Sequence, residues 1–170
     1  MPALNCGMIE MEQNKRKKLR LENYDYGSNG AYFVTICTHE KAELFGKVGE
    51  PSEAADKIKE VFESVLSECS QIKCPQYVVM PNHLHALLVI DNIESTSDMT
   101  ISDFVRVFKS KTTVAYIRLV KEGKAQPFEG KLWQRSYYDH VIRNEQDFLE
   151  VWEYIAENPL RWQLRKQKVL

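Results

Sequence analysis

Hydrophobic residues occur along this chain in two patterns, as short continuous runs typical of strands and as longer repeats typical of helices. β-branched and aromatic residues fill positions 31–38 after the turn-forming segment 27–30, which predicts a first strand. Two further apolar runs, at 77–80 and 83–90, are separated only by a proline and an asparagine. That connection is too short for a crossover helix, so the two runs are expected to form an antiparallel hairpin.

Three longer segments repeat apolar residues at helical spacing. The first helix is expected to open at Pro51, and the second to begin with Ser102 as its N-cap and to end near Gly123. The third is expected to begin after Asn144 and to run through Glu157. Its buried stripe is predicted to contain Phe148, Val151, Trp152 and Ile155.

A fourth strand is expected within 131–142, which gives the order β-α-β-β-α-β-α. This is the split βαβ, ferredoxin-like pattern that RNA-recognition modules also have, with one helix added. We therefore predict an α+β fold with an antiparallel four-stranded sheet and an extra C-terminal helix. Residues 1–20 are predicted to form a flexible basic arm, and residues 21–170 a single domain.

The composition narrows the class of protein. A chain of 170 residues with 44% hydrophobic and 28% charged residues is typical of a soluble domain with its own core. There is no apolar run long enough to span a membrane and no secretory leader pattern, so a cytoplasmic location without a membrane partner is predicted. The four cysteines lack C-x-x-C spacing, which disfavours a zinc knuckle or a redox motif.

The distribution of charge matters more than the net charge of −1. Basic residues gather in three clusters, at 15–20, 106–124 and 161–168, whereas acidic residues concentrate in 40–68 and 145–157. Such clusters are compatible with a nucleic-acid partner and equally with solvated surface.

The pair His83 and His85 is the sharpest local signal for chemistry. Residues two apart on a strand point to the same face, so the two imidazoles would lie side by side as ligands for one divalent metal ion. The same pattern also fits histidines that only satisfy local hydrogen bonds.

The third predicted helix offers further candidates. Tyr154 and Asn158 lie one turn apart at the margin of its buried stripe. Pro159 disfavours the helical conformation at Asn158, so the Asn158 amide oxygen is expected at a frayed helix end. One amide oxygen and two imidazoles suit Mg²⁺ or Mn²⁺. A tyrosine that merely packs against the core is the alternative for Tyr154.

Several segments spread over residues 20–160 resemble, in the same order, the single-tyrosine HUH transposases of small single-stranded insertion sequences. The segment MPNHLHALLV, which contains the histidine pair, resembles the HUH motif. Other segments are similar to the REP-associated tyrosine transposases in that group: Arg20–Tyr26 with Gly30–Thr38, Phe104–Lys111, and Trp133–Arg143 with Tyr154–Pro159.

The resemblance implies a metal-dependent endonuclease and strand transferase that acts on single-stranded DNA carrying a hairpin. It implies that His83 and His85 hold the metal and that Tyr154 is the nucleophile, forming a 5′-phosphotyrosine intermediate. Asn158 would be the third ligand, although relatives often have glutamine there. Both homodimers and monomers occur among such proteins, so the oligomeric state stays open.

Other assignments remain open as well. Arg106, Lys109 and Lys111 are the leading candidates for contacts to DNA phosphates, and His140 is a candidate accessory group near the nucleophile. Tyr137 and Tyr138 are rival nucleophiles; neighbours on a strand face opposite ways, so one of them is expected in the core. The alternative functions are a non-catalytic nucleic-acid binder and a different metal hydrolase, although neither H-E-x-x-H nor C-x-x-C is present.

Overall fold

The computed structural model describes residues 29–91 and 99–168 and contains one four-stranded antiparallel sheet in the order β2-β3-β1-β4. The strands are β1 (Gly30–Cys37), β2 (Ile72–Met80), β3 (His83–Ile90) and β4 (Tyr138–Val141). The helices are α1 (Glu53–Glu68), α2 (Ile101–Lys121) and α3 (Glu145–Gln167), with one 3-10 turn at His39–Lys41. The predicted α+β, ferredoxin-like order is confirmed. The predicted basic arm, residues 1–20, lies outside the described residues.

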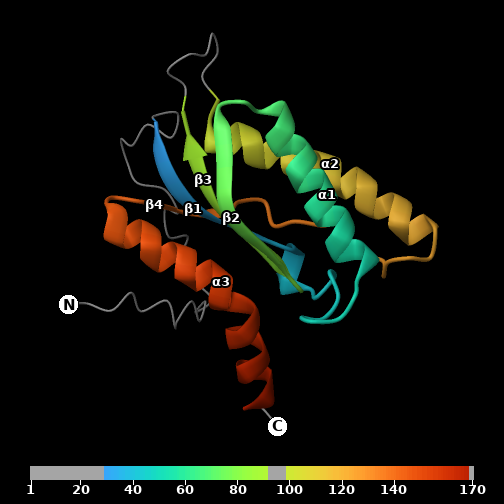
Figure 1. Cartoon of the computed structure of the whole chain (residues 1–170). Helices are drawn as coiled ribbons and strands as arrows, with labels where there is room; N and C mark the ends of the chain where they lie inside the picture. The colour runs from blue at the N-terminus through green and yellow to red at the C-terminus, as the bar shows by residue number, and fades with distance from the viewer. Residues whose placement is uncertain (1–28, 92–98, 169–170) are drawn as a thin grey trace.

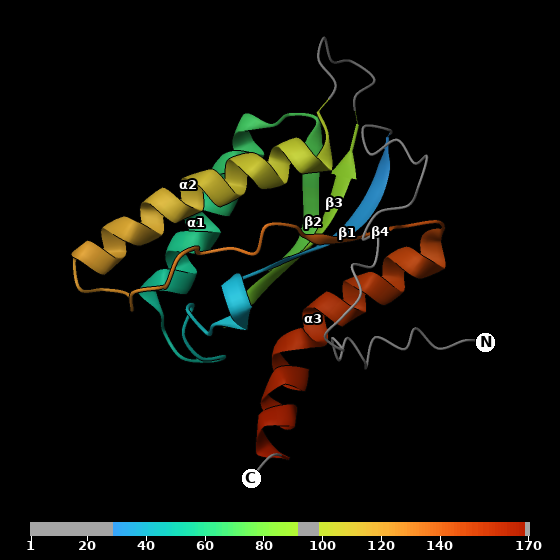
Figure 2. The ribbon, with the colours of Figure 1, turned by 180° about the vertical axis from the view of Figure 1, so that it is seen from behind.

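The helices sit on both faces of the sheet: α1 and α2 cover one face, and α3 lies across the other (Figure 1 and Figure 2). Within the described part of the chain, no helix is both long enough and apolar enough to cross a membrane.

The alternation of side chains along the strands builds a separate apolar cluster on each face. Tyr32, Val34 and Ile36 of β1 belong to the large cluster under α1 and α2. Phe62, Phe104 and Phe108 meet in that cluster edge to face, with ring centroids 5.5–5.7 Å apart. A small cluster of Phe33, Leu87, Val151 and Ile155 holds α3 on the opposite face. The large cluster therefore packs α1 and α2 against one face of the sheet, and a much smaller cluster packs α3 against the other.

The start of α2 corrects one prediction. Its N-cap is Thr100, not Ser102: the Thr100 hydroxyl accepts a hydrogen bond from the Asp103 amide, and the Asp103 carboxylate accepts one from the Thr100 amide. A reciprocal pair of this kind satisfies two backbone donors, whereas Ser102 would satisfy one. The Ser102 hydroxyl instead lies 2.9 Å from the Tyr137 hydroxyl.

The end of α3 corrects a second prediction. The helix does not end at Glu157 but continues through Pro159 to Gln167. Proline removes one helical hydrogen bond, and the helix axis bends near its middle (Figure 1). The loop before α1 supports the second half of the helix, because the Gln163 amide donates to the Val48 carbonyl at 3.3 Å and the Lys166 ammonium to the Glu43 carboxylate at 2.6 Å.

The buried face of α3 is also rotated from the predicted one. Val151 and Ile155 are buried as expected, but Trp152 is 37% exposed. Asn158 is only 6% exposed, so it lies inside the helix and against the sheet instead of at a frayed end. The face that meets the sheet therefore includes the polar residues proposed for chemistry.

Candidate active site

The histidine pair lies on the face of β3 that α3 covers. His85 stands opposite Thr35 of β1 and His83 opposite Cys37. The two imidazole centroids are 4.4 Å apart, which confirms the expectation that the rings project side by side. His85 is 6% exposed and His83 is half-buried, so His83 is the more accessible of the two rings.

Each ring is held through its Nδ1 atom. The His83 Nδ1 lies 2.6 Å from the Asn82 side-chain oxygen, and the His85 Nδ1 lies 2.8 Å from the Thr35 hydroxyl. An amide oxygen can only accept, so this contact favours the His83 tautomer that carries the proton on Nδ1, which would leave the Nε2 lone pair for a metal ion. This is how metal-binding histidines are usually oriented by their neighbours.

Burial keeps both imidazoles neutral at physiological pH. It lowers the pKa of His83 to about 4; the hydrogen bond with Asn158 opposes this shift, and the positive charges of Lys41 and Arg165 add to it. Burial lowers the pKa of His85 well below its ordinary value, and the neighbouring His83 lowers it further. The neutral ring is the form that binds a metal ion.

Helix α3 brings the candidate nucleophile onto this pair. The half-buried Tyr154 ring lies 5.4 Å from the His85 ring and packs edge-on against Phe33 at 5.7 Å, centroid to centroid. One turn further on, Asn158 hydrogen-bonds His83. Four side chains that the sequence singled out thus meet at one place, and their roles in chemistry stay predictions.

The second half of α3 adds cationic and aromatic groups that were not predicted at the site, although its arginines belong to the basic cluster at 161–168. The Arg161 guanidinium lies 5.8 Å from the centre of the Tyr154 ring, and the Trp162 ring 5.8 Å from that of His83. Arg165 is near enough for its charge to act on His83, as is Lys41 from the 3-10 turn. Helical spacing from Tyr154 is the signal that could have found them, because positions 4, 7, 8 and 11 residues later share one helix face.

The three predicted DNA-contact residues lie elsewhere, on α2, behind the sheet from the histidines. The Lys109 ammonium donates to the carbonyl oxygens of the 134–136 segment at 2.8–3.4 Å. Arg106 pairs with Asp103 at 3.4 Å, and Lys111 binds the Glu68 carboxylate. Their role in DNA binding stays a prediction, and from this position it would concern DNA away from the histidine pair.

The remaining candidates also have definite surroundings. The His140 Nε2 lies 3.0 Å from both carboxylate oxygens of Asp147, in the first turn of α3, so this ring joins β4 to α3. Tyr137 is buried and Tyr138 is 39% exposed, which confirms that only one of the two packs in the core. Tyr138 shares the face of Phe33, with ring centroids 6.4 Å apart, and is the nearer rival of Tyr154.

The residues at the site offer an incomplete set of donors for a divalent cation. No group of three His, Cys, Asp or Glu side chains able to hold a metal ion occurs among residues 29–91 and 99–168. Two neutral imidazoles and the Asn158 amide are instead the available donors, a set that leaves coordination positions for phosphate oxygens. The alternative of a zinc hydrolase therefore gains no support from the described residues.

Comparison with known proteins gives a family match over most of the chain. The family described as "Transposase IS200 like" matches residues 27–158. An uncharacterized protein of Haemophilus influenzae is 30% identical over 87% of this chain and 90% of its own length. A second protein of that organism, named as a candidate REP-associated tyrosine transposase, is 21% identical over 83% of this chain and 77% of its own.

Two solved structures share the fold. A REP-associated tyrosine transposase bound to a REP hairpin matches with a TM-score of 0.57 and 20% identity, over 84% of this chain and 73% of that one. A candidate transposase from Deinococcus radiodurans matches with a TM-score of 0.50 and 21% identity, over 81% of this chain and 95% of that one.

Proposed function

We propose that this chain, which belongs to the IS200-like transposase family, is a metal-dependent endonuclease and strand transferase for single-stranded DNA. The observation that supports this most is the position of Tyr154, whose ring lies 5.4 Å from the buried His85 of the histidine pair. A nucleophile beside two neutral imidazoles is what a phosphoryl transfer through a covalent enzyme intermediate needs.

The proposed reaction is a transesterification at one phosphodiester. The Tyr154 oxygen forms a bond to phosphorus, and the bond from phosphorus to the 3′ oxygen breaks. The phenol loses its proton and the departing 3′ oxygen gains one, which leaves a 5′-phosphotyrosine and a free 3′-hydroxyl. One phosphodiester replaces another, so a second 3′-hydroxyl reverses the step and joins strands without a nucleotide energy source.

His83, His85 and Asn158 would hold the metal ion, Mg²⁺ or Mn²⁺. Bound there, the ion would offset the negative charge of the scissile phosphate and orient it for in-line attack. Asn82 and Thr35 fix the rings through Nδ1, and the packing of Tyr154 against Phe33 restricts where the phenol oxygen lies.

The second half of α3 would hold the DNA strand near the cut. Arg165 and Lys41 lie close to the histidine pair and are suited to phosphate oxygens, and the Trp162 ring offers a surface on which a base can stack. Since one structural relative is bound to a REP hairpin, we propose single-stranded DNA with a flanking hairpin as the substrate.

The alternative of a non-catalytic nucleic-acid binder fits the structure less well. RNA-recognition modules stack bases on aromatic residues of the sheet face that their two helices leave open. In this chain α3 covers that face, and a histidine pair stands on it beneath Tyr154.

Metal-dependent cutting tests the proposal directly. The protein is incubated with Mn²⁺ and either a single strand from the flanks of its own gene that carries a hairpin, or the same sequence as a plain duplex. We expect cutting of the single strand only, and no cutting after chelation by EDTA. Efficient cutting of the duplex, or a preference for RNA, would point to a different class of enzyme.

Thr35→Val is expected to weaken metal binding with little change in the fold. Valine keeps the shape of threonine but cannot hydrogen-bond the His85 Nδ1, which now lies 2.8 Å from the hydroxyl. Without such a supporting hydrogen bond, metal affinity typically falls about 10- to 100-fold. Calorimetric titration with Mn²⁺ measures it, with Thr113→Val on α2 as the matched control. Unchanged Mn²⁺ affinity in Thr35→Val would mean that the hydroxyl does not orient a ligand.

Arg165→Gln is expected to reduce the salt dependence of DNA binding. Removal of one cation that binds a phosphate lowers the slope of log affinity against log salt by about 0.7 for a single strand. Fluorescence anisotropy at several salt concentrations measures this slope. Arg106→Gln, on the opposite side of the sheet, is the matched control. A slope that falls for Arg106→Gln and not for Arg165→Gln would place the DNA along α2.

A further inference from the structure

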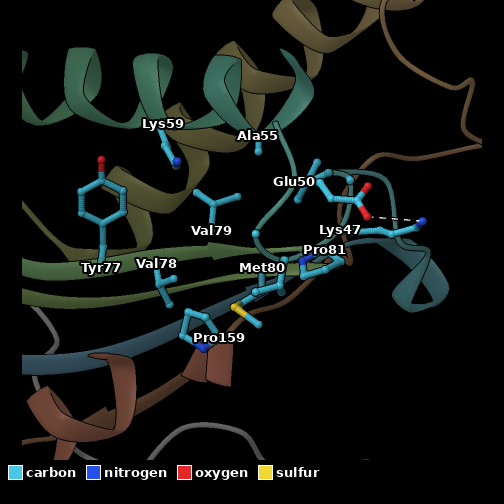
Figure 3. Close-up of a pocket in the computed structure, with 14 residues that line it drawn as sticks. Lys47, Glu50, Ala55, Lys59, Tyr77, Val78, Val79, Met80, Pro81 and Pro159 are labelled. Carbon is cyan, nitrogen blue, oxygen red and sulfur yellow. Dashed lines mark ion pairs between the residues drawn. The ribbon is translucent and has the colours of Figure 1, made fainter. Parts of the chain in front are cut away.

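A cavity of about 530 Å³ lies at the outer edge of β2 (Figure 3). Strand β2 is the last strand on its side of the sheet, so this edge pairs with no further strand in the described residues. Ala55 and Lys59 of α1 lie above the strand in this view and Pro159 of α3 lies below it. Residues of the loop 45–50 also line the cavity.

The cavity and the candidate active site share two pieces of chain. Met80 and Pro81, which line the cavity, directly precede the Asn82 that holds His83. Pro159, also in the wall, directly follows Asn158. A strand whose phosphate lies at the histidine pair therefore has this cavity within reach of a neighbouring nucleotide.

The lining suits a flat, partly polar group. Partly exposed apolar residues in the wall include Val48, Val79 and Pro159, and Tyr77 adds an aromatic ring. Phe45 and Met80 also line the cavity but are almost fully buried. An outer strand also directs backbone donors and acceptors outward, and these can pair with polar edge atoms of a ligand. Cavities of this volume with apolar walls and a few polar groups are typical small-molecule sites.

Two lysines and one glutamate line the cavity. Lys47 Nζ lies 3.6 Å from the lining residue Glu50, and Lys59 Nζ lies 3.9 Å from Asp56, so each lysine forms an ion pair with a residue three positions away in the sequence. Both lysine side chains are at least half exposed. Each can turn to a phosphate on either side of an inserted base.

We propose that this cavity binds one unpaired nucleobase of the DNA strand, next to or one nucleotide beyond the phosphate that is cut. The proposal rests on the proposed function for its ligand and extends it to a second subsite. Insertion of a base would fix which phosphate reaches Tyr154, so the cavity would set the position of the cut. Apolar contact with the flat faces of the base supplies the affinity, and the edge of β2 meets its polar atoms.

Removal of single bases, combined with a filled cavity, tests the proposal. Single-stranded oligonucleotides that carry one abasic site at each position in turn are bound to the full chain, with Tyr154→Phe present so that nothing is cut. Fluorescence anisotropy gives each affinity. Ala55→Phe fills the cavity from α1, and Ala55→Leu is a smaller change that the fold tolerates more easily. Ser64→Phe is the matched control, nine residues further along α1 and on its opposite side.

With an open cavity, we expect one or two adjacent positions at which loss of the base weakens binding by about five- to 100-fold. In Ala55→Phe the affinity for the intact oligonucleotide should fall by a similar factor. An abasic site at the same position should then cause no further loss of affinity. Lys59→Gln should weaken all oligonucleotides alike, and Ser64→Phe should leave the pattern unchanged.

An unchanged pattern in folded Ala55→Phe and Ala55→Leu would overturn the proposal, and a change only in self-association would assign the β2 edge to a protein strand. Cutting by the unmodified chain is measured separately. If the filled cavity changes the pattern but no DNA is cut, the base site stands and the nuclease proposal fails. If DNA is cut but the filled cavity leaves the pattern unchanged, the nuclease proposal stands and the base site fails.

Discussion

His83→Ala and His85→Ala are each expected to abolish DNA cutting and to remove most Mn²⁺ binding. The two rings lie 4.4 Å apart, and the His85 ring lies 5.4 Å from that of Tyr154, so each is expected to supply one metal ligand that the other cannot replace. A bound cation contributes several kcal/mol of charge stabilisation to phosphoryl transfer, and about 4 kcal/mol corresponds to about a 1000-fold loss of rate. Cleavage rates and calorimetric Mn²⁺ titration measure the two effects.

A histidine remote from the pair provides the control. His39 lies in the exposed 3-10 turn, and His39→Ala should keep both activity and Mn²⁺ affinity. His85 is buried, so His85→Ala is also expected to lower the free energy of unfolding by about 1–3 kcal/mol, and thermal unfolding must show that the variant is folded during the assay. Full metal-dependent activity in either variant of the pair would refute the assignment of the metal site.

Tyr154→Phe is expected to eliminate cutting while the protein still binds Mn²⁺ and DNA. The phenyl ring keeps the edge-on contact with Phe33 but has no oxygen to attack phosphorus. Loss of one hydroxyl should change the free energy of unfolding by no more than about 1 kcal/mol. Tyr138→Phe and Tyr137→Phe are the matched controls, and both should still cut DNA. Of the two, Tyr138 is the sharper control because it is exposed on the same face of the sheet.

Sequence periodicity was sufficient for the architecture because each element has a local cause. Runs of β-branched, aromatic and other apolar residues predicted the strands, and the two-residue turn before His83 left only an antiparallel hairpin. Placement of the histidines on one face follows from the strand geometry alone. The predicted N-cap of α2, Ser102, was wrong because Thr100 and Ser102 can both cap a helix. Only the reciprocal hydrogen bonds between Thr100 and Asp103 decide between them.

The continuation of α3 beyond Pro159 could not be predicted from the sequence. Proline normally ends or kinks a helix, and local rules favour the ending. Here the loop 43–50 supports the residues beyond it, through hydrogen bonds that span more than 100 positions of sequence, so the helix continues. Arg161, Trp162 and Arg165 reach the site only because of that continuation. The cavity at β2 was equally hidden, since its walls come from four separate segments.

Identification of the residue that becomes linked to DNA shows whether Tyr154 is the nucleophile. The protein is incubated with Mn²⁺ and a hairpin-bearing single strand labelled at its 3′ end, the covalent adduct is isolated on a denaturing gel, and mass spectrometry maps the linked peptide. We expect a single adduct, through a 5′ phosphate on Tyr154, that disappears in Tyr154→Phe and persists in Tyr138→Phe. An adduct on Tyr137 or Tyr138, or hydrolytic products with no adduct on any tyrosine, would contradict it.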